Sequence, residues 1–361
     1  MNLPLANKTT FGFHSQFTEP ERSRQTIALA EACGFDAVAV GDHLSFPLPI
    51  SDPLLQLAQV AALSENLAIH TSVFLLALRH PLAVAKQVAT LDRISSGRLI
   101  FGVGVGGEFP NEFAAVGVPV RERGSRLDES VEVMRKLWTG EAITHQGRHF
   151  QMTNLEMLPT PARADGPPIW CGGRSEAALK RAGTRLDGWV SYVVTPTMYA
   201  QGLETIEKHY TLAKRNLDSF GTAHLVYMRL AKSWDSAFEI ASQRLSERYA
   251  MDFGPATKKY VALGRPEDIA ETLHAFHVAG VRHIEIDFIG SEAEKDTQIR
   301  WFSEEVRPLL DFRQRAIDIP FEQYNNDEHL KGTALWILVD WASGTPPINS
   351  RLLNGQALSK R

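Results

Sequence analysis

The feature that most constrains the fold is a regular alternation of short apolar segments with segments of helical spacing. Eight segments have the apolar or β-branched character of strands: Thr10–His14, Ala37–Gly41, Ala68–Leu75, Leu99–Val105, Pro168–Gly172, Gly188–Val194, His224–Leu230 and His283–Ile289. Between them, apolar residues recur at helical spacing, as at Val84, Val88 and Leu91 and again from Leu127 to Trp138. Because strands that alternate with helices pair in parallel, this order predicts a parallel sheet flanked by helices.

Glycines mark three of the junctions between a helix and the next strand. Gly34, Gly183 and Gly280 each follow a helical segment and stand a few residues before an apolar one. Glycine readily takes the left-handed conformation that ends a helix, so we expect each of them to do so. The repeated junction predicts repeated βα units. Eight such units predict an α/β fold, the (β/α)8 TIM barrel.

Two segments fall outside this repeat. Residues 141–165 predict a hairpin-like insertion around Gly147, followed by a proline-rich connection. The late segment Leu330–Trp341 has the pattern of one helix, which would pack on the barrel or on a second subunit. We therefore expect one barrel domain over residues 1–311 and a C-terminal extension of unknown role over residues 312–361, with a homodimer left open.

Composition and charge exclude several classes of partner. The net charge of −4 gives no general attraction to nucleic acid or to anionic lipid, so we expect neither nucleic acid nor a membrane as partner. Cys33 and Cys171 lack the spacing of a disulfide framework or a thiolate site, which suits a reducing cytoplasm. His274 and His277 have no accompanying carboxylate motif, so we expect no metal. The start of the sequence lacks the pattern of a signal peptide, and Thr333–Ser343 is too short and too charged to span a bilayer.

Candidate site residues follow from the predicted fold, because active sites of α/β barrels lie at the carboxyl ends of the strands. The residues in such places are His14, Asp42–His43, 72–76, 104–111 and 172–176. His43 can act as a general acid or base, or donate to a bound ring. The competing interpretation is a loop histidine bonded to backbone. Asp42 is expected to orient a neighbouring group or to cap the loop.

The stretch from Gly172 to Ser175 combines two glycines, an arginine and a serine that can cap a helix. Exposed backbone amides and the positive end of a helix suit a phosphate group. A tight turn followed by an ordinary helix cap would need the same residues. The position after a predicted strand favours phosphate.

The run Gly102-x-Gly104-x-x-Gly107 has the letters of a dinucleotide-binding turn but not its context. Pro110 interrupts the run that follows, and Asp128, the nearest acidic candidate, falls inside a helical pattern. The lysine and hydroxyl of a nucleotide phosphate loop are also missing. These glycines therefore need another explanation.

The blocks that contain these residues resemble the bacterial-luciferase-like family of flavin- and deazaflavin-dependent oxidoreductases. The longest block begins at His80-PLAVAKQVATLDRISSGRLIFGVGVGGEF and continues to Gly140. Gly34-FDAVAVGDHL and Pro168-IWCGGRSEAALKRAG match further signatures, and the resemblance covers roughly residues 9–310. It explains the glycines as the end of the fourth barrel strand, where missing side chains let a tricyclic ring lie close to the backbone.

The resemblance also implies roles for single residues. Asp42 and His43 would border the ring, and His43 matches the position of a catalytic histidine. Ser72–Val73 falls where members carry a non-proline cis peptide behind the ring. Glu108 and Asn111 fall where the deazaflavin branch places cofactor contacts, although the loop here is one residue longer.

The predicted cofactor-binding residues are Asp42, Ser72, Val73, Gly104, Gly106, Asn111, Gly172, Gly173, Arg174 and Ser175. His43 and Glu108 are the catalytic candidates, and Gly172 to Ser175 resemble the cofactor-phosphate segment. No metal ligands are expected.

The activity implied by the resemblance is that of an oxidoreductase acting on a small organic substrate. Reduced FMN with O2 would give a monooxygenase, which would work beside a separate flavin reductase. The deazaflavin coenzyme F420 would give hydride transfer, with His43 or Glu108 exchanging the accompanying proton. The glycine loop and the motif Gly41-DH favour the deazaflavin.

Two other classes stay open. The first is a non-catalytic flavin-binding protein. The second is a cofactor-free barrel lyase or isomerase that binds a phosphorylated substrate, although no lysine follows a predicted strand as a Schiff-base candidate.

Overall fold

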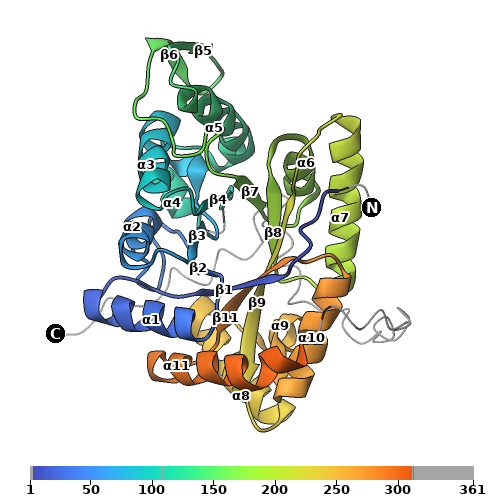
Figure 1. Cartoon of the computed structure of the whole chain (residues 1–361). Coiled ribbons are helices and arrows are strands. Elements are labelled where there is room, and N and C mark those ends of the chain that lie inside the picture. Colours follow the sequence, from blue (N-terminus) through green and yellow to red (C-terminus); the bar gives the residue numbers. More distant parts are fainter. Residues whose placement is uncertain (1–2, 108, 311, 313–361) are drawn as a thin grey trace, which may run out of the picture. The chain divides into compact units, whose positions relative to one another are not determined.

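Eight parallel strands close into a barrel with helices around it (Figure 1). The computed structural model describes residues 3–107, 109–310 and 312. In sheet order the barrel strands are β1 (Thr10–His14), β2 (Ala37–Val40), β3 (Ala68–Thr71), β4 (Leu99–Val103), β7 (Ile169–Gly172), β8 (Gly188–Tyr192), β9 (Gly221–Leu230) and β11 (His283–Phe288). The pairing of β11 with β1 closes the ring, so the predicted (β/α)8 barrel is confirmed. A short strand that the sequence did not indicate, β10 (Ala262–Gly264), pairs with the end of β9.

Helices follow most of the strands. They are α1 (Pro20–Ala32), α2 (Pro53–Leu63), α3 (Pro81–Ile94), α4 (Pro110–Ala115), α5 (Arg123–Trp138), α6 (Glu176–Arg185), α7 (Pro196–Leu212), α8 (Trp234–Tyr249), α9 (Gly254–Tyr260), α10 (Pro266–Val278) and α11 (Glu292–Trp301). Proline is the first residue of several of them, because its fixed φ suits the first turn and its missing N–H is not needed there. The predicted helical patterns at 84–94 and 127–138 coincide with α3 and α5.

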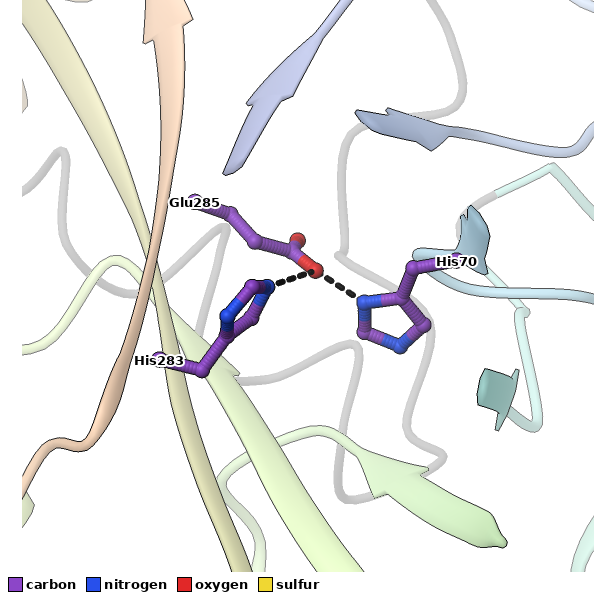
Figure 2. Close-up of side chains that lie close together, drawn as sticks. All are labelled: His70, His283 and Glu285. Atoms are coloured by element: carbon purple, nitrogen blue, oxygen red, sulfur yellow. Dashed lines mark hydrogen bonds and ion pairs between the residues drawn. The ribbon is translucent and has the colours of Figure 1, made fainter. Parts of the chain in front are cut away.

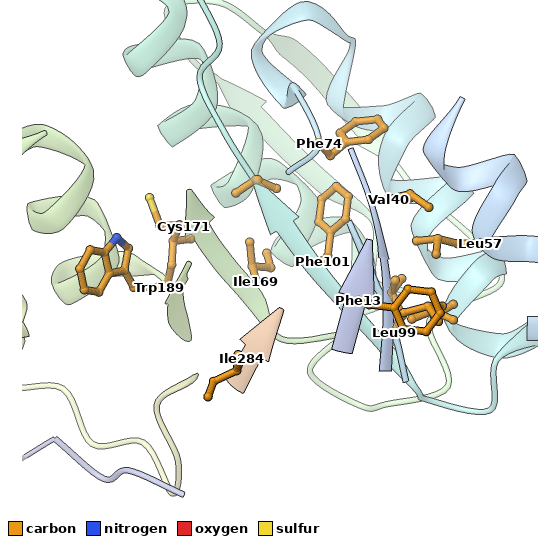
Figure 3. Close-up of a cluster of buried hydrophobic side chains, with 14 of the residues drawn as sticks. Phe13, Val40, Leu57, Phe74, Leu99, Phe101, Ile169, Cys171, Trp189 and Ile284 are labelled. Carbon is orange, nitrogen blue, oxygen red and sulfur yellow. The ribbon is translucent and has the colours of Figure 1, made fainter. Parts of the chain in front are cut away.

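The strands are buried on both faces. All four residues of β2 are buried, as expected where helices cover one side of a sheet and the barrel interior covers the other. Outside the barrel, Leu57 of α2 belongs to the same apolar cluster as Phe13 and Val40 (Figure 3). Helix and strand are therefore held together by one continuous hydrophobic core.

Inside the barrel, small residues make room for large ones. A Cβ atom on Gly102 would lie 2.7 Å from Nε2 of His70. A Cβ atom on Gly221 would lie 2.2 Å from the ring of Trp170. Glycine at position 221 is thus required by the ring of Trp170, and at position 102 by the ring of His70 together with the backbone oxygen of Thr71, 2.1 Å from such a Cβ.

One of the three predicted helix-ending glycines is assigned wrongly. Gly34 and Gly280 have positive φ values of +69° and +108°, as predicted. Gly183, in contrast, lies within α6, which continues to Arg185. A Cβ atom there would lie 2.5 Å from the carbonyl oxygen of Ile206 on α7. The glycine therefore serves the close packing of two helices and not a helix end.

The predicted insertion is confirmed as a hairpin of two antiparallel strands, β5 (Ile143–Gln146) and β6 (Gln151–Leu155). The predicted C-terminal extension, residues 312–361, lies outside the described residues apart from Phe312, and so does the predicted helix Leu330–Trp341. None of the helices in the described ranges combines the length and apolarity needed to cross a bilayer.

We expect the stability to fall in acid because of a buried neutral histidine. His224 on β9 is 1% exposed, and its Nδ1 lies 2.8 Å from Oγ of Ser191. Burial lowers the pKa of His224 to about 3, whereas an unfolded histidine titrates near pH 6.5. Between these values the unfolded chain binds the extra proton. The contribution of His224 to the free energy of unfolding is therefore fully present above about pH 6.5. Below that pH it falls by up to about 1.4 kcal/mol per pH unit.

Urea unfolding at a series of pH values checks this expectation with wild type and His224→Gln. The variant is expected to be less stable at neutral pH, but to lose stability less steeply below about pH 6.5. His209→Gln, at a histidine whose partner Glu176 is exposed, is the control and should keep the wild-type slope. Equal slopes in all three proteins would contradict the role of His224.

Candidate active site

The predicted site residues converge on one part of the barrel rim. They follow the carboxyl ends of β2, β3, β4 and β7, which are neighbours in the sheet. Because parallel strands end at the same edge, the loops that begin at 41, 72, 104 and 173 lie beside one another. Glu108 lies outside the described residues, so its catalytic role stays a prediction.

His43 is held by a buried carboxylate. Its Nδ1 lies 3.1 Å from Oε2 of Glu112, a residue that is 1% exposed. A carboxylate accepts hydrogen bonds, so Nδ1 donates and Nε2 keeps a free lone pair. The other oxygen of Glu112 accepts the backbone N–H groups of Leu44 at 2.6 Å and Ser45 at 2.9 Å. One carboxylate thus fixes both the ring and the loop that carries it.

Two phenylalanines enclose the same ring. Phe46 stacks on His43 with centroids 4.4 Å apart, and Phe109 meets it edge-on at 5.4 Å. About a fifth of the His43 side chain is exposed. An oriented imidazole with one free nitrogen in apolar surroundings is suited to exchange a proton with a bound molecule.

The sequence analysis missed Glu112 and named its neighbours instead. Pro110 begins the short helix α4, so the next residues form its first turn. Asn111 is exposed on that turn, whereas Glu112 and Phe113 are buried. The sequence did hold a signal for Glu112: it is an acidic residue beside the predicted cofactor contact Asn111.

Asp42 has its carboxylate engaged by other parts of the protein. Its two oxygens accept Nη1 and Nη2 of Arg79 at 2.6 and 2.8 Å, and one of them also accepts the N–H of Leu75 at 2.8 Å. These bonds tie the loop after β2 to the segment after β3. They support the predicted orienting role of Asp42, and its contact with a cofactor stays a prediction.

The predicted cis peptide bond is present between Ser72 and Val73. The side chain of Val73 then packs between two glycines. A Cβ atom on Gly104 would lie 2.5 Å from its Cγ2, and one on Gly172 would lie 2.8 Å from its Cγ1. Val73 therefore fills the space beside these two glycines, which the resemblance assigned to a ring. Its side chain is half-buried and offers an apolar surface at the rim. Gly106 turns the chain with a φ of +58°.

The turn after β7 has the features expected of an anion site. Gly173 has a φ of +108°, and Ser175 caps α6 by accepting the N–H of Ala178 at 3.3 Å. The guanidinium of Arg174 donates from Nη1 to the carbonyl oxygen of Val193 at 2.5 Å. The cation is therefore fixed beside the positive end of the helix.

One cavity borders the turn after β7, and a second lies away from the rim. One of about 220 Å³ is lined by Arg174 and by residues of α7 such as Met198. The other, of about 440 Å³, is lined by Thr9 and Arg282, which directly precede β1 and β11. The larger cavity is therefore at the amino-terminal end of the barrel, away from the edge that carries the predicted site.

The opposite side of the rim carries a polar group that the sequence analysis did not find. The hydroxyl groups of Tyr227 and Tyr249 lie 2.7 Å apart, and Nη1 of Arg248 lies 2.5 Å from Oδ2 of Asp287. Asp287 raises the pKa of Arg248. Burial opposes ionisation of Asp287, but Arg248 holds its pKa below the usual range. Tyr227 and Asp287 are paired near the ends of β9 and β11. The signal available in the sequence was that each lies near the end of a predicted strand.

The sequence profile of the family described as luciferase-like monooxygenase matches residues 7–283. The chain therefore belongs to this family. An F420-dependent glucose-6-phosphate dehydrogenase of Nakamurella multipartita is 27% identical over 338 residues, which cover 83% of this chain and 96% of the relative.

Solved structures show the same fold. The monooxygenase RslO1 from Streptomyces bottropensis has a TM-score of 0.73 at 24% identity, over 83% of this chain and 99% of the other. An F420-dependent secondary alcohol dehydrogenase in complex with an F420–acetone adduct also has a TM-score of 0.73, at 21% identity, over 84% and 99%. The prediction of a luciferase-like oxidoreductase is confirmed, and either F420 or FMN fits the family.

Removal of the Glu112 carboxylate is expected to destabilise the rim. Glu112→Ala leaves two backbone N–H groups and the ring of His43 without their acceptor, which should lower the free energy of unfolding by about 1–3 kcal/mol. Glu141→Ala, at an exposed position, is the matched control and should stay near wild type. Urea unfolding measures both, and equal stabilities would show that Glu112 does not hold the loop.

Proposed function

We propose that the chain is an F420-dependent oxidoreductase that interconverts a small alcohol and its carbonyl compound. The observation that carries this proposal is the pair formed by His43 and Glu112 at the rim. Oxidation of an alcohol removes a hydride and a proton, and bound F420 supplies the hydride acceptor. Nε2 of His43, left free by the bond from Nδ1 to Glu112, is the acceptor for the proton.

The rim residues fit a flat ring that carries a phosphate-bearing tail. Val73 and the backbone beside it offer the ring an apolar surface. The turn from Gly173 to Ser175 offers the phosphate a cation, backbone amides and the positive end of α6. Glu108 and Asn111 are assigned as further cofactor contacts, and Glu108 as an alternative proton acceptor.

The polar wall across the rim, formed by Tyr227, Arg248, Tyr249 and Asp287, is assigned to the substrate. Hydroxyl groups of paired tyrosines can both donate and accept hydrogen bonds. Arg248 is already neutralised by Asp287. This wall therefore favours a polar, uncharged substrate over a phosphorylated one.

The proposal also bears on partners and location. Hydride transfer with F420 leaves no step for a separate flavin reductase. A cytoplasmic location is supported by Cys33 and Cys171, which are both free and buried. Burial raises the pKa of the Cys171 thiol to about 11, so this cysteine is not a nucleophile near neutral pH. A homodimer remains part of the proposal.

The proposal is tested by titrating the purified protein with F420 and with FMN, and then screening uncharged alcohols for reduction of bound F420. We expect F420 to bind and to lose its fluorescence when a substrate is present. Tight binding of FMN, with oxygen consumption and no reduction of F420, would identify a monooxygenase instead. Binding of a cofactor without turnover in any screen would favour a binding protein.

Variants at the pair formed by His43 and Glu112 test the proton transfer. His43→Ala is expected to lower kcat by roughly 10²–10⁴-fold while the melting temperature and the Kd for F420 change little. Glu112→Gln presents an amide to Nδ1, which reverses the tautomer of His43 and should lower kcat similarly. Wild-type kcat in His43→Ala, with chemistry rate-limiting, would reduce His43 to a wall of the pocket and leave Glu108 as the candidate.

A charge change at the turn after β7 tests the phosphate site. Arg174→Gln removes the cation beside α6 and is expected to raise the Kd for F420 roughly tenfold, about 1.4 kcal/mol. Arg185→Gln, at an exposed position at the other end of the same helix, is the control. The same Kd in both variants would place the phosphate elsewhere.

A further inference from the structure

A carboxylate and three imidazoles lie in the interior of the barrel, from His283 at the start of β11 to His14 at the end of β1. We call His14, His70, His283 and Glu285 the barrel cluster. They come from β1, β3 and β11, and Figure 2 shows His70 and His283 on either side of the Glu285 carboxylate. His70 and Glu285 are fully buried and His283 is 5% exposed. About 15% of the His14 side chain is exposed, the largest share in the cluster.

Hydrogen bonds join His14 and His70 to Glu285, and His283 contacts the same carboxylate. Oε2 of Glu285 lies 3.2 Å from Nε2 of His14, and Oε1 is hydrogen-bonded to Nδ1 of His70. Burial opposes ionisation of Glu285, but the imidazoles around it, His70 foremost, hold its pKa well below the usual range. Burial lowers the pKa of His70, so this ring is neutral and donates its one proton to the carboxylate.

The buried charge of Glu285 needs a compensating proton. Among the described residues, its ion-pair partners are all histidines, with no lysine or arginine. His283 is the third imidazole beside this carboxylate, in contact with it but without a hydrogen bond to it. Its Nε2 faces Oε1 of Glu285 at 3.6 Å, and its Nδ1 lies 2.7 Å from the hydroxyl of Thr10, which in turn donates to a backbone carbonyl. An unpaired buried carboxylate would cost several kcal/mol, so a proton held in the cluster is favoured.

A metal ion is the competing occupant. Donor atoms of His70, His283 and Glu285 lie within 4.8 Å of one another. However, Oε1 of Glu285, the oxygen that faces both rings, is already engaged by the N–H of His70. The contacts therefore favour protons.

His14 connects the barrel cluster to the mouth. It is the last residue of β1, at the carboxyl edge of the barrel, and its Nε2 proton points to Glu285. Its Nδ1 is thereby left as the proton acceptor. The arrangement repeats that of His43 and Glu112 at another place on the same rim: an imidazole at the end of a strand, held through one nitrogen by a buried carboxylate.

We propose that His14 is a second proton-transfer residue of this site, and that Glu285, His70 and His283 are positioning residues that hold its tautomer and keep a proton in the barrel interior. The inference rests on the proposed function. When an alcohol is oxidised, the C–H bond breaks with its electron pair going to the cofactor ring. The O–H bond breaks with its proton going to a base, and a bound F420 would supply the hydride acceptor and a second place at which a proton is exchanged. Two proton transfers need two groups, and His14 serves the transfer that His43 does not.

The test compares His14→Gln, Glu285→Gln and the double variant in the F420 enzyme. Each single variant is expected to lower kcat by about 10²-fold or more, with a smaller effect on KM. The double variant should be no slower than His14→Gln, because Glu285 acts through His14. Added imidazole should restore part of the activity of His14→Gln. The control His209→Gln should keep wild-type activity, and imidazole should not change it.

A measurement without substrate separates this proposal from the proposed function. In ¹⁵N spectra of the protein alone, Glu285→Gln should shift the ring nitrogens of His14, His70 and His283 together. An inactive wild type with this joint shift would overturn the proposed function and support the network. Any of four results would overturn the proposal. They are a wild-type kcat in His14→Gln, losses of activity that add in the double variant, ring nitrogens that shift independently, and one equivalent of zinc in the purified protein. If Glu285→Gln does not fold, His70→Asn takes its place in the same comparison.

Discussion

A closed barrel of eight strands must fill its own interior, and the rest of this molecule depends on how that space is filled. Here the filling is partly polar. Glu285 stands in the middle with histidines around it, and Gly12 and Gly102 leave room for the rings of His283 and His70. Glu285 is on β11, and its hydrogen-bond partners His14 and His70 are on β1 and β3. The hydrogen bonds therefore hold together strands on both sides of the closing pair β11 and β1.

Buried carboxylates also fix the loops at the rim. Asp42 ties the loop after β2 to Arg79, and Glu112 ties the same loop to α4. Each carboxylate accepts more than one donor, so the loops gain rigidity from few side chains. The free nitrogen of His43 consequently has a defined position before any ligand arrives, which is the form of preorganisation that proton transfer requires.

The sequence was sufficient for features that depend on neighbours along the chain. Strand and helix periodicity predicted the barrel, and the position of His43 after a strand placed it at the rim. The partners of these residues were out of reach, because Glu112 lies 69 positions from His43 and Glu285 lies 215 positions from His70. The prediction that Gly183 ends a helix was wrong for the same reason. The role of this glycine depends on the approach of α7, which no local sequence pattern indicates.

The packing of Val73 between Gly104 and Gly172 restricts how this rim can evolve. Three positions on three strand ends form one steric unit, because a side chain at either glycine would occupy space that Val73 already fills. A lineage that acquires alanine at position 104 must first shorten residue 73, and the intermediate would carry a cavity at the rim. Natural variants and engineered libraries are therefore expected to change these three positions together. Randomising one position at a time would yield mostly destabilised variants.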